Sequence, residues 1–156
     1  PEIKEKYVLV YTLSGSSYIK RLSQYVANRL NCKIVDMRID FQKNKDGNVI
    51  TCYELGPREW VGLISKAQYV ITDSFHGTAF SINFNKPFTT LVNPVSNMNS
   101  RVLSILEITQ LTNRIIYDDG ENIMPKDLTI DFRSVNQIIE QWRKKSIDFI
   151  HKSLQE

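Results

Sequence analysis

Short apolar runs alternate along the chain with segments in which apolar residues recur every three or four positions. The first run, YVLVYTL at residues 7–13, is dense in β-branched and aromatic residues, which is typical of a strand buried on both faces. The same pattern predicts five further strands, at 32–39, 48–54, 68–72, 88–92 and 113–118.

The segments between these runs have helical spacing and helix-start signals. Their apolar positions predict helices at 17–30, 57–67, 77–84 and 101–111. Pro57 stands at the favoured first position of its helix. Ser134 with Gln137 is a capping-box pattern, which predicts the start of a long C-terminal helix. The polar stretch DFQKNKDGN at 40–48 is interpreted as a loop.

Strands and helices therefore alternate almost without exception. This order predicts a doubly wound α/β fold, with a mostly parallel sheet of about six strands and helices on both faces. No composition shift or repeat marks a boundary inside the chain, so we expect residues 1–156 to form one Rossmann-like domain.

Composition narrows the function classes. Hydrophobic residues make up 42% and charged residues 24% of the chain, which is ordinary for a globular protein, and the net charge is +3. The basic residues form no stripe with interleaved aromatics, so we expect no nucleic-acid partner. The apolar runs are much shorter than the roughly 20 residues of a membrane-spanning helix. Cys32 and Cys52 are interpreted as buried small hydrophobes in a reducing compartment.

Ligands of doubly wound sheets bind beyond the carboxyl ends of the strands, so the loops that follow strands are the candidate sites. The first of these loops, SGSS, places Ser14, Gly15 and Ser16 at that edge. It lacks the dinucleotide and P-loop patterns, but its N–H groups and hydroxyls can hold an anion at a helix N-terminus. A plain turn with an N-cap explains the same residues equally well.

The stretch ITDSFHGTAF at 71–80 is the second candidate, because a predicted strand gives way there to a helix. We expect the unpaired N–H groups of Gly77 and Thr78 to face an anion beside His76. His76 then either binds that anion and acts as general acid or base, or is a histidine hydrogen-bonded in a loop. Asp73 either orients His76 or caps the helix.

Arg101 follows the fifth predicted strand and is the third candidate. It is interpreted either as a bidentate anion clamp or as a solvated surface arginine. The chain has only two histidines, and they are too far apart in the sequence to form a zinc site, so we expect no metal. No G-x-S-x-G elbow supports a serine nucleophile.

The segment GPREWVGLISKAQYVITDSFHGTAFSINFNKPF at 56–88 resembles the C-terminal half of polysaccharide pyruvyl transferases. That family has a Pro-led helix, an apolar strand, a D/S-x-[FL]-H-G motif, a helix of small and apolar residues and a Pro-initiated strand. NSRVLSILEITQL at 99–111 is similar to the next helix of the family, with its leading arginine. The resemblance covers most of the chain, and 56–111 is its specific part.

The resemblance implies a two-domain enzyme similar to GT-B glycosyltransferases, with residues 1–156 as the donor-binding half and an N-terminal domain completing the cleft. The family transfers a pyruvate ketal from phosphoenolpyruvate to two hydroxyls of a sugar in a glycan or lipid-linked saccharide, without a cofactor. His76 would assist proton transfer to the methylene carbon, and Gly77, Thr78 and Arg101 would hold the phosphate or carboxylate. We expect the chain alone to be inactive, because half of the cleft is absent.

Ser74 is a departure from the family, many of whose members carry arginine at this position, so a donor contact is lost or replaced. The implied location is cytoplasmic, with peripheral attachment to the inner face of the membrane left open. Two alternative functions fit the fold. One is a GT-B glycosyltransferase domain that uses a nucleotide sugar, and the other is a catalytically silent binding module.

Overall fold

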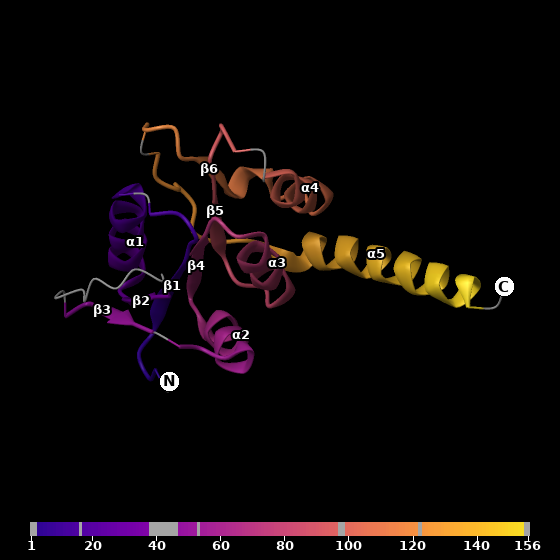
Figure 1. The fold of residues 1–156 in the computed structure, drawn as a ribbon, viewed down its shortest axis with the longest axis horizontal. Coiled ribbons are helices and arrows are strands. Elements are labelled where there is room, and N and C mark those ends of the chain that lie inside the picture. The colour runs from indigo at the N-terminus through magenta and orange to yellow at the C-terminus, as the bar shows by residue number, and fades with distance from the viewer. Residues whose placement is uncertain are drawn as a thin grey trace.

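The computed structural model describes residues 3–15, 17–37, 47–52, 54–96, 99–121 and 123–154. Within these residues the strands form one six-stranded sheet in the order β3-β2-β1-β4-β5-β6, and all neighbouring strands are parallel (Figure 1). The strands are β1 (Tyr7–Tyr11), β2 (Lys33–Asp36), β3 (Val49–Thr51), β4 (Tyr69–Thr72), β5 (Phe88–Val92) and β6 (Ile115–Tyr117). The predicted doubly wound parallel sheet is confirmed.

Helices cover both faces of the sheet. The helix α1 (Ser17–Leu30) lies on one face, and α2 (Pro57–Lys66), α3 (Phe75–Asn83) and α4 (Ser100–Ile108) lie on the other (Figure 1). A short 3-10 turn, η2 (Thr112–Arg114), leads into β6. The long helix α5 (Phe132–Ser153) packs on the second face with its first turns and then leaves the body of the domain.

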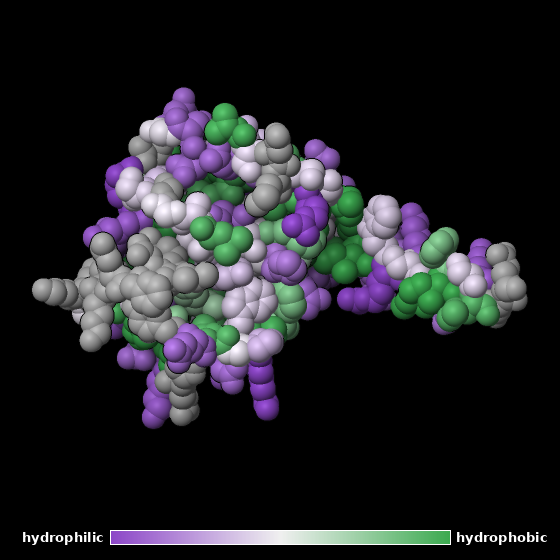
Figure 2. Space-filling model, in the orientation of Figure 1, coloured by the Kyte–Doolittle hydropathy of each residue, from purple (hydrophilic) through white to green (hydrophobic). Residues whose placement is uncertain are grey.

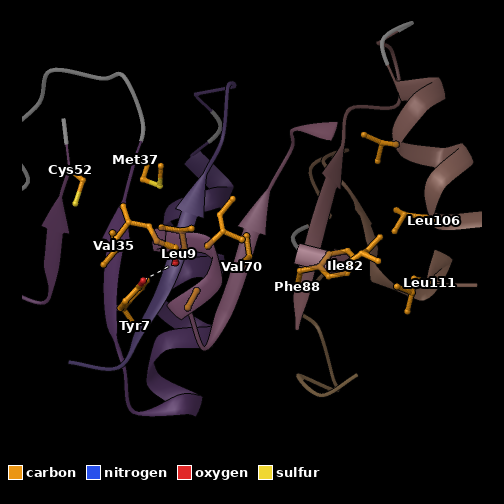
Figure 3. Packing of buried hydrophobic residues seen from close by; sticks show 14 of the residues in the cluster. Tyr7, Leu9, Val35, Met37, Cys52, Val70, Ile82, Phe88, Leu106 and Leu111 are labelled. Atoms are coloured by element: carbon orange, nitrogen blue, oxygen red, sulfur yellow. Dashed lines mark hydrogen bonds between the residues drawn. The ribbon is translucent and has the colours of Figure 1, made fainter. Parts of the chain in front are cut away.

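The dense apolar runs reflect strands that are buried on both sides. In β1, Leu9 packs with Val35 and Val70 on the α2–α4 side (Figure 3). Its neighbours Val8 and Val10 point to the opposite core beneath α1, because successive side chains of a strand alternate between faces. Both layers therefore need apolar residues at every position of the central strands.

Two predicted helix starts are corrected by the structure. The helix predicted at 77–84 begins two residues earlier, at Phe75, with Ser74 as the N-cap residue. The C-terminal helix begins at Phe132 rather than at Ser134, because the Asp131 carboxylate accepts a hydrogen bond from the Arg133 N–H at 3.1 Å and caps it. Most of the loop predicted at 40–48 lies outside the described residues.

The centre of the sheet determines where a ligand can bind. From β1 the chain passes through α1 to β2 on one side, and from β4 it passes through α3 to β5 on the other side. The loops after β1 and β4 therefore diverge, and in doubly wound folds such a divergence gives a crevice at the carboxyl edge in which ligands bind. We refer to this edge, between the β1–α1 and β4–α3 turns, as the crevice.

A close approach between a helix and a strand positions this crevice. Gly77 in α3 is buried, and a Cβ atom on it would lie 2.2 Å from Thr72 Oγ1 at the end of β4. That hydroxyl oxygen also accepts a hydrogen bond from the Ser74 N–H at 3.1 Å. Only glycine lets the first turn of α3 lie directly on the end of its strand.

We predict that Gly77→Ala lowers the free energy of unfolding by about 1–3 kcal/mol, because Thr72 must move to admit the methyl group. Gly62→Ala in α2 is the matched control, since no atom lies within 4 Å of its new methyl group. That control should raise stability by up to about 1 kcal/mol through helix propensity. Urea unfolding measures both changes. Equal stability of Gly77→Ala and the parent would contradict the close approach.

Candidate active site at the carboxyl edge of the sheet

The carboxylate of Asp73 joins the two loops of the crevice. It accepts hydrogen bonds from the Leu13 N–H at 2.7 Å and from the Ser14 N–H at 2.8 Å, one on each oxygen. Among the described residues no hydrogen bond links Asp73 to His76, and Asp73 does not cap α3. Asp73 thus has a role that the sequence did not indicate, which is to hold the β1–α1 turn against the β4–α3 turn.

The β1–α1 turn lies at the surface of this site. Ser14 and Gly15 are exposed, and no atom lies within 4 Å of a Cβ placed on Gly15. The Ser14 N–H already donates a hydrogen bond to Asp73, so it is not free to bind an anion. Ser16, the third residue predicted for this loop, lies outside the described residues.

Ser74 and Thr78 are buried and fix the start of α3. The Ser74 carbonyl oxygen accepts hydrogen bonds from the N–H and from Oγ1 of Thr78, both at 3.0 Å. Thr78 Oγ1 also lies 2.9 Å from Thr90 Oγ1 in β5. Since the Thr78 N–H is used inside the helix, the unpaired donors of the first turn belong to Phe75, His76 and Gly77.

Phe75 contacts both His76 and Arg101. The His76 ring is exposed and meets the Phe75 ring edge-on, with the ring centroids 5.6 Å apart. The guanidinium carbon of Arg101, in the first turn of α4, lies 5.2 Å from the centroid of the same Phe75 ring. A cation–π contact of this kind stabilises an exposed arginine by about 0.5–1 kcal/mol. The sequence pattern indicates His76 and Arg101 as site residues but not Phe75, although Phe75 directly precedes His76.

Thr12 is a second residue at this edge that the sequence pattern does not indicate. It follows the last residue of β1 at the same edge, beside Asp73, because Tyr11 pairs with Thr72 in the register. Its Oγ1 is buried and has no hydrogen-bond partner within the described part of the chain. Buried polar groups in folded proteins are almost always paired, so a water molecule or a ligand atom is the expected partner.

The site as a whole is open to solvent at His76 and Arg101, and two of its features favour an anion. Arg101 and the N-terminal end of α3 both favour an anion, and the carboxylate of Asp73 is occupied by backbone N–H groups. Within the described ranges, no group of three His, Cys, Asp or Glu residues could hold a metal ion. The chemistry this arrangement allows is therefore anion binding next to a histidine that can transfer a proton.

The family model for polysaccharide pyruvyl transferase matches residues 1–94. This range includes both loops of the crevice and His76. The chain belongs to the polysaccharide pyruvyl transferase family. Arg101 lies beyond the matched range, so its place in the site rests on the structure. No curated protein sequence matches the chain.

Solved structures similar to this pyruvyl transferase family member share its fold at low sequence identity. A glycotransferase of kitacinnamycin has a TM-score of 0.61 and 16% identity, over 97% of this chain and 44% of its own. The spinosyn forosaminyltransferase SpnP has a TM-score of 0.54 and 14% identity, and the alignment covers 98% of this chain and 44% of SpnP. A UDP-GlcNAc 2-epimerase from Neisseria meningitidis, bound to UDP-GlcNAc, has a TM-score of 0.50 and 14% identity. The alignment covers 92% of this chain and 37% of the epimerase chain.

These comparisons show the Rossmann-like glycosyltransferase type of fold, and the chain spans less than half the length of each structure. Separately, none of the helices in the described ranges combines the length and apolar character needed to cross a membrane.

We predict that Asp73→Asn loosens the crevice. The side-chain amide has one oxygen in place of two, so it cannot accept one hydrogen bond on each terminal atom from the Leu13 and Ser14 N–H groups. The free energy of unfolding should fall by about 1–2 kcal/mol, near the lower range for hydrogen bonds to a charged group. Amide hydrogen exchange at Leu13 and Ser14 should accelerate. Asp148→Asn, on the exposed part of α5, is the control and should change stability by less than about 0.5 kcal/mol. Unchanged exchange at both amides would exclude the linking role.

Proposed function

We propose that residues 1–156 form the donor-binding half of a polysaccharide pyruvyl transferase that uses phosphoenolpyruvate. The observation that supports this most directly is the grouping of His76 and Arg101 on the Phe75 ring, at the first turn of α3 in a member of this family. The grouping offers one proton-transfer group, His76, and two kinds of hydrogen-bond donor for an anion, which are the N–H groups at the start of α3 and the Arg101 guanidinium.

Phosphoenolpyruvate has chemical groups that match these donors. It carries a phosphate and a carboxylate on one central carbon, next to a methylene carbon. We assign one anionic group to the N–H donors at residues 75–77, where the helix end favours negative charge. The other is assigned to the Arg101 guanidinium, whose planar fork suits carboxylate and phosphate oxygens. His76 then lies beside the methylene carbon.

The proposed reaction balances without a cofactor. His76 protonates the methylene carbon, which becomes a methyl group, and the central carbon accepts the first acceptor hydroxyl oxygen. The bond from the central carbon to the phosphate oxygen breaks, and a second acceptor hydroxyl adds to close the ketal. One hydroxyl proton accounts for the new methyl hydrogen and restores His76, and the other leaves with the phosphate.

The open surface of the site supports a second domain in the proposed enzyme. Ser14, Gly15, His76 and Arg101 are exposed to solvent, whereas proton transfer to carbon is helped by excluding water. We assign the missing cover, and the binding of the saccharide acceptor, to an N-terminal domain of the same protein. The acceptor would be a glycan or lipid-linked precursor of a cell-surface polysaccharide, handled at the cytoplasmic side.

Ser74 remains the position at which this chain departs from many family members. Its side chain is buried at the N-cap position of α3. Arg101, which reaches the site from α4 through Phe75, is our candidate for the replacement of that donor contact.

We predict that phosphoenolpyruvate raises the melting temperature of the two-domain protein and that UDP- and GDP-sugars do not. At a ligand concentration of 100 times Kd the stabilisation is about 2.7 kcal/mol. Arg101→Lys should reduce the rise in melting temperature, because an ammonium group lacks the planar, bidentate geometry of a guanidinium. Arg143→Lys on α5 is the control and should leave the rise unchanged. A shift with nucleotide sugars alone would support the glycosyltransferase alternative and reject the proposed donor.

We predict that His76→Ala lowers kcat for ketal formation about 10²- to 10⁴-fold, the usual contribution of a general acid. His151→Ala, at the other histidine of the chain, is the control and should retain full activity. Ketal formation is measured by NMR together with phosphate release, and residues 1–156 alone should form no ketal. Full activity of His76→Ala would favour a catalytically silent role for this domain.

A further inference from the structure

A pocket of about 340 Å³ lies at the amino end of β5 and β6, on the face of the sheet that α1 covers. One wall consists of Thr89 in β5 and residues 113–116, which lead into β6. The other wall consists of residues 123–127, which we call the strap. The His76 crevice lies at the carboxyl end of the strands, so the pocket and the crevice occupy opposite edges of the sheet.

The strap is held in place by side chains of α1. Three of its backbone carbonyl oxygens, at residues 123, 125 and 126, accept hydrogen bonds from the side chains of Tyr18, Tyr25 and Arg29. Figure 1 shows this segment in orange, next to α1. Since the strap is held through its backbone, its side chains are left to line the pocket.

Arg114 is the buried cation of the pocket. Figure 2 shows hydrophilic residues scattered over the face of the domain that it draws, where charges are solvated and attract anions weakly. The Arg114 side chain is only 10% exposed, so its charge acts more strongly on a nearby anion. A buried cation of this kind needs acceptors around its guanidinium group.

One edge of the Arg114 guanidinium has no acceptor. Nη1 donates a hydrogen bond to the Asp127 carbonyl oxygen at 2.9 Å. Nη2 lies 3.9 Å from Asp127 Oδ2, which is beyond hydrogen-bond distance. Nε is buried and has no hydrogen-bond partner within the described part of the chain. The Nε–Nη2 edge is therefore open, and a carboxylate forms two parallel hydrogen bonds with such an edge.

Thr129 holds the Asp127 carboxylate at this distance. Oδ1 of Asp127 accepts hydrogen bonds from the N–H and from Oγ1 of Thr129, at 2.8 and 2.7 Å. These two bonds are the main reason that the pKa of Asp127 is below its usual range, so its carboxyl group is ionised at neutral pH. The charged residues that line the pocket are Arg114, Lys126 and Asp127, and two cations with one carboxylate leave one positive charge. This charge suits a monoanion.

Thr89 supplies a second donor at the same wall. It stands beside Arg114 in the sheet, because Thr90 pairs with Ile115 in the register. Its Oγ1 lies 2.6 Å from the hydroxyl oxygen of the buried Tyr69. Two hydroxyl groups carry two protons, and the hydrogen bond between them uses one. The other proton has no acceptor among the described residues, so with Tyr69 as the donor the Thr89 O–H is free for a ligand oxygen.

We propose that this pocket binds a small monocarboxylate with a short apolar body, at a site separate from the proposed donor site. The two carboxylate oxygens accept hydrogen bonds from Nε and Nη2 of Arg114, and the Thr89 hydroxyl donates a third. The apolar body lies against Ile116, Ile123 and Met124, which a water molecule in the same place would leave without an apolar partner. Nε is closed to water in this conformation, so side chains of the strap shift to admit the ligand. Binding is favoured because it pairs a buried donor that otherwise has no acceptor.

A titration of the full-length protein with isovalerate, acetate and inorganic phosphate tests the class of ligand. The readout is the 15N-edited NMR signal of the Arg114 Nε–H, assigned through the residue's own backbone. We expect isovalerate to shift this signal with a Kd of about 30 mM or lower, the limit for seven non-hydrogen atoms at low ligand efficiency. Acetate should bind at least about tenfold more weakly, since it lacks three of the carbon atoms to be buried. A weaker affinity for isovalerate, tighter binding of phosphate or equal affinity for acetate would overturn the proposal.

Two variants test the location of the bound carboxylate. Arg114→Lys keeps the charge but loses the planar fork, so isovalerate should bind at least about tenfold more weakly. Ile123→Trp narrows the pocket from a side chain that is 53% exposed and leaves Arg114 and Thr89 unchanged. It should weaken binding to a similar extent, and it remains informative if Arg114→Lys fails to fold. Saturation-transfer NMR on isovalerate measures both variants, and unchanged binding in Ile123→Trp would contradict the proposed site.

Arg101→Lys is the control at the His76 crevice, on the opposite edge of the sheet, and should leave isovalerate binding unchanged. Loss of isovalerate binding in this variant would place the carboxylate in the crevice and reject the second site, whatever the response to phosphoenolpyruvate. Isovalerate binding that depends on Arg114, without any phosphoenolpyruvate-induced rise in melting temperature, would support the pocket and reject the proposed donor.

Discussion

The close approach of Gly77 to Thr72 determines where the first turn of α3 lies. Because Gly77 has no side chain, α3 starts directly on the end of β4, and residues 75–77 lie at the carboxyl edge of the sheet. The Thr72 hydroxyl fills the space that a side chain at 77 would need and also holds the Ser74 N–H. Phe75, in the same turn, contacts the rings and charges on both sides of it, namely the His76 imidazole and the Arg101 guanidinium.

Family membership and fold make different contributions to the functional argument. The fold is shared with enzymes whose names describe glycosyl transfer and epimerisation, so it places a ligand at the edge of the sheet but does not select the reaction. The family match covers residues 1–94, which include the histidine that follows β4.

The alternation of strands and helices and the layers could be predicted from sequence because each depends on a repeated local signal, whereas the strand order depends on pairing between remote segments. Strands buried on both faces must be apolar at every position, and Leu9 and Val10 follow that rule towards opposite cores. The start of α3 was misplaced because the Thr78 N–H and hydroxyl both bond to the Ser74 carbonyl oxygen, and propensity does not reveal such bonds. The role of Asp73 depends on Leu13 and Ser14, which are remote in the sequence.

The bond from Leu13 to Asp73 spans 60 residues of sequence, so the crevice is a non-local structure. It cannot form until β1 and β4 have paired at the centre of the sheet, and closing a loop of that length is among the slower steps of folding. A chain in which these strands are still unpaired therefore lacks the link between the β1–α1 and β4–α3 turns. Anion binding at this edge would report that the central strands have already assembled.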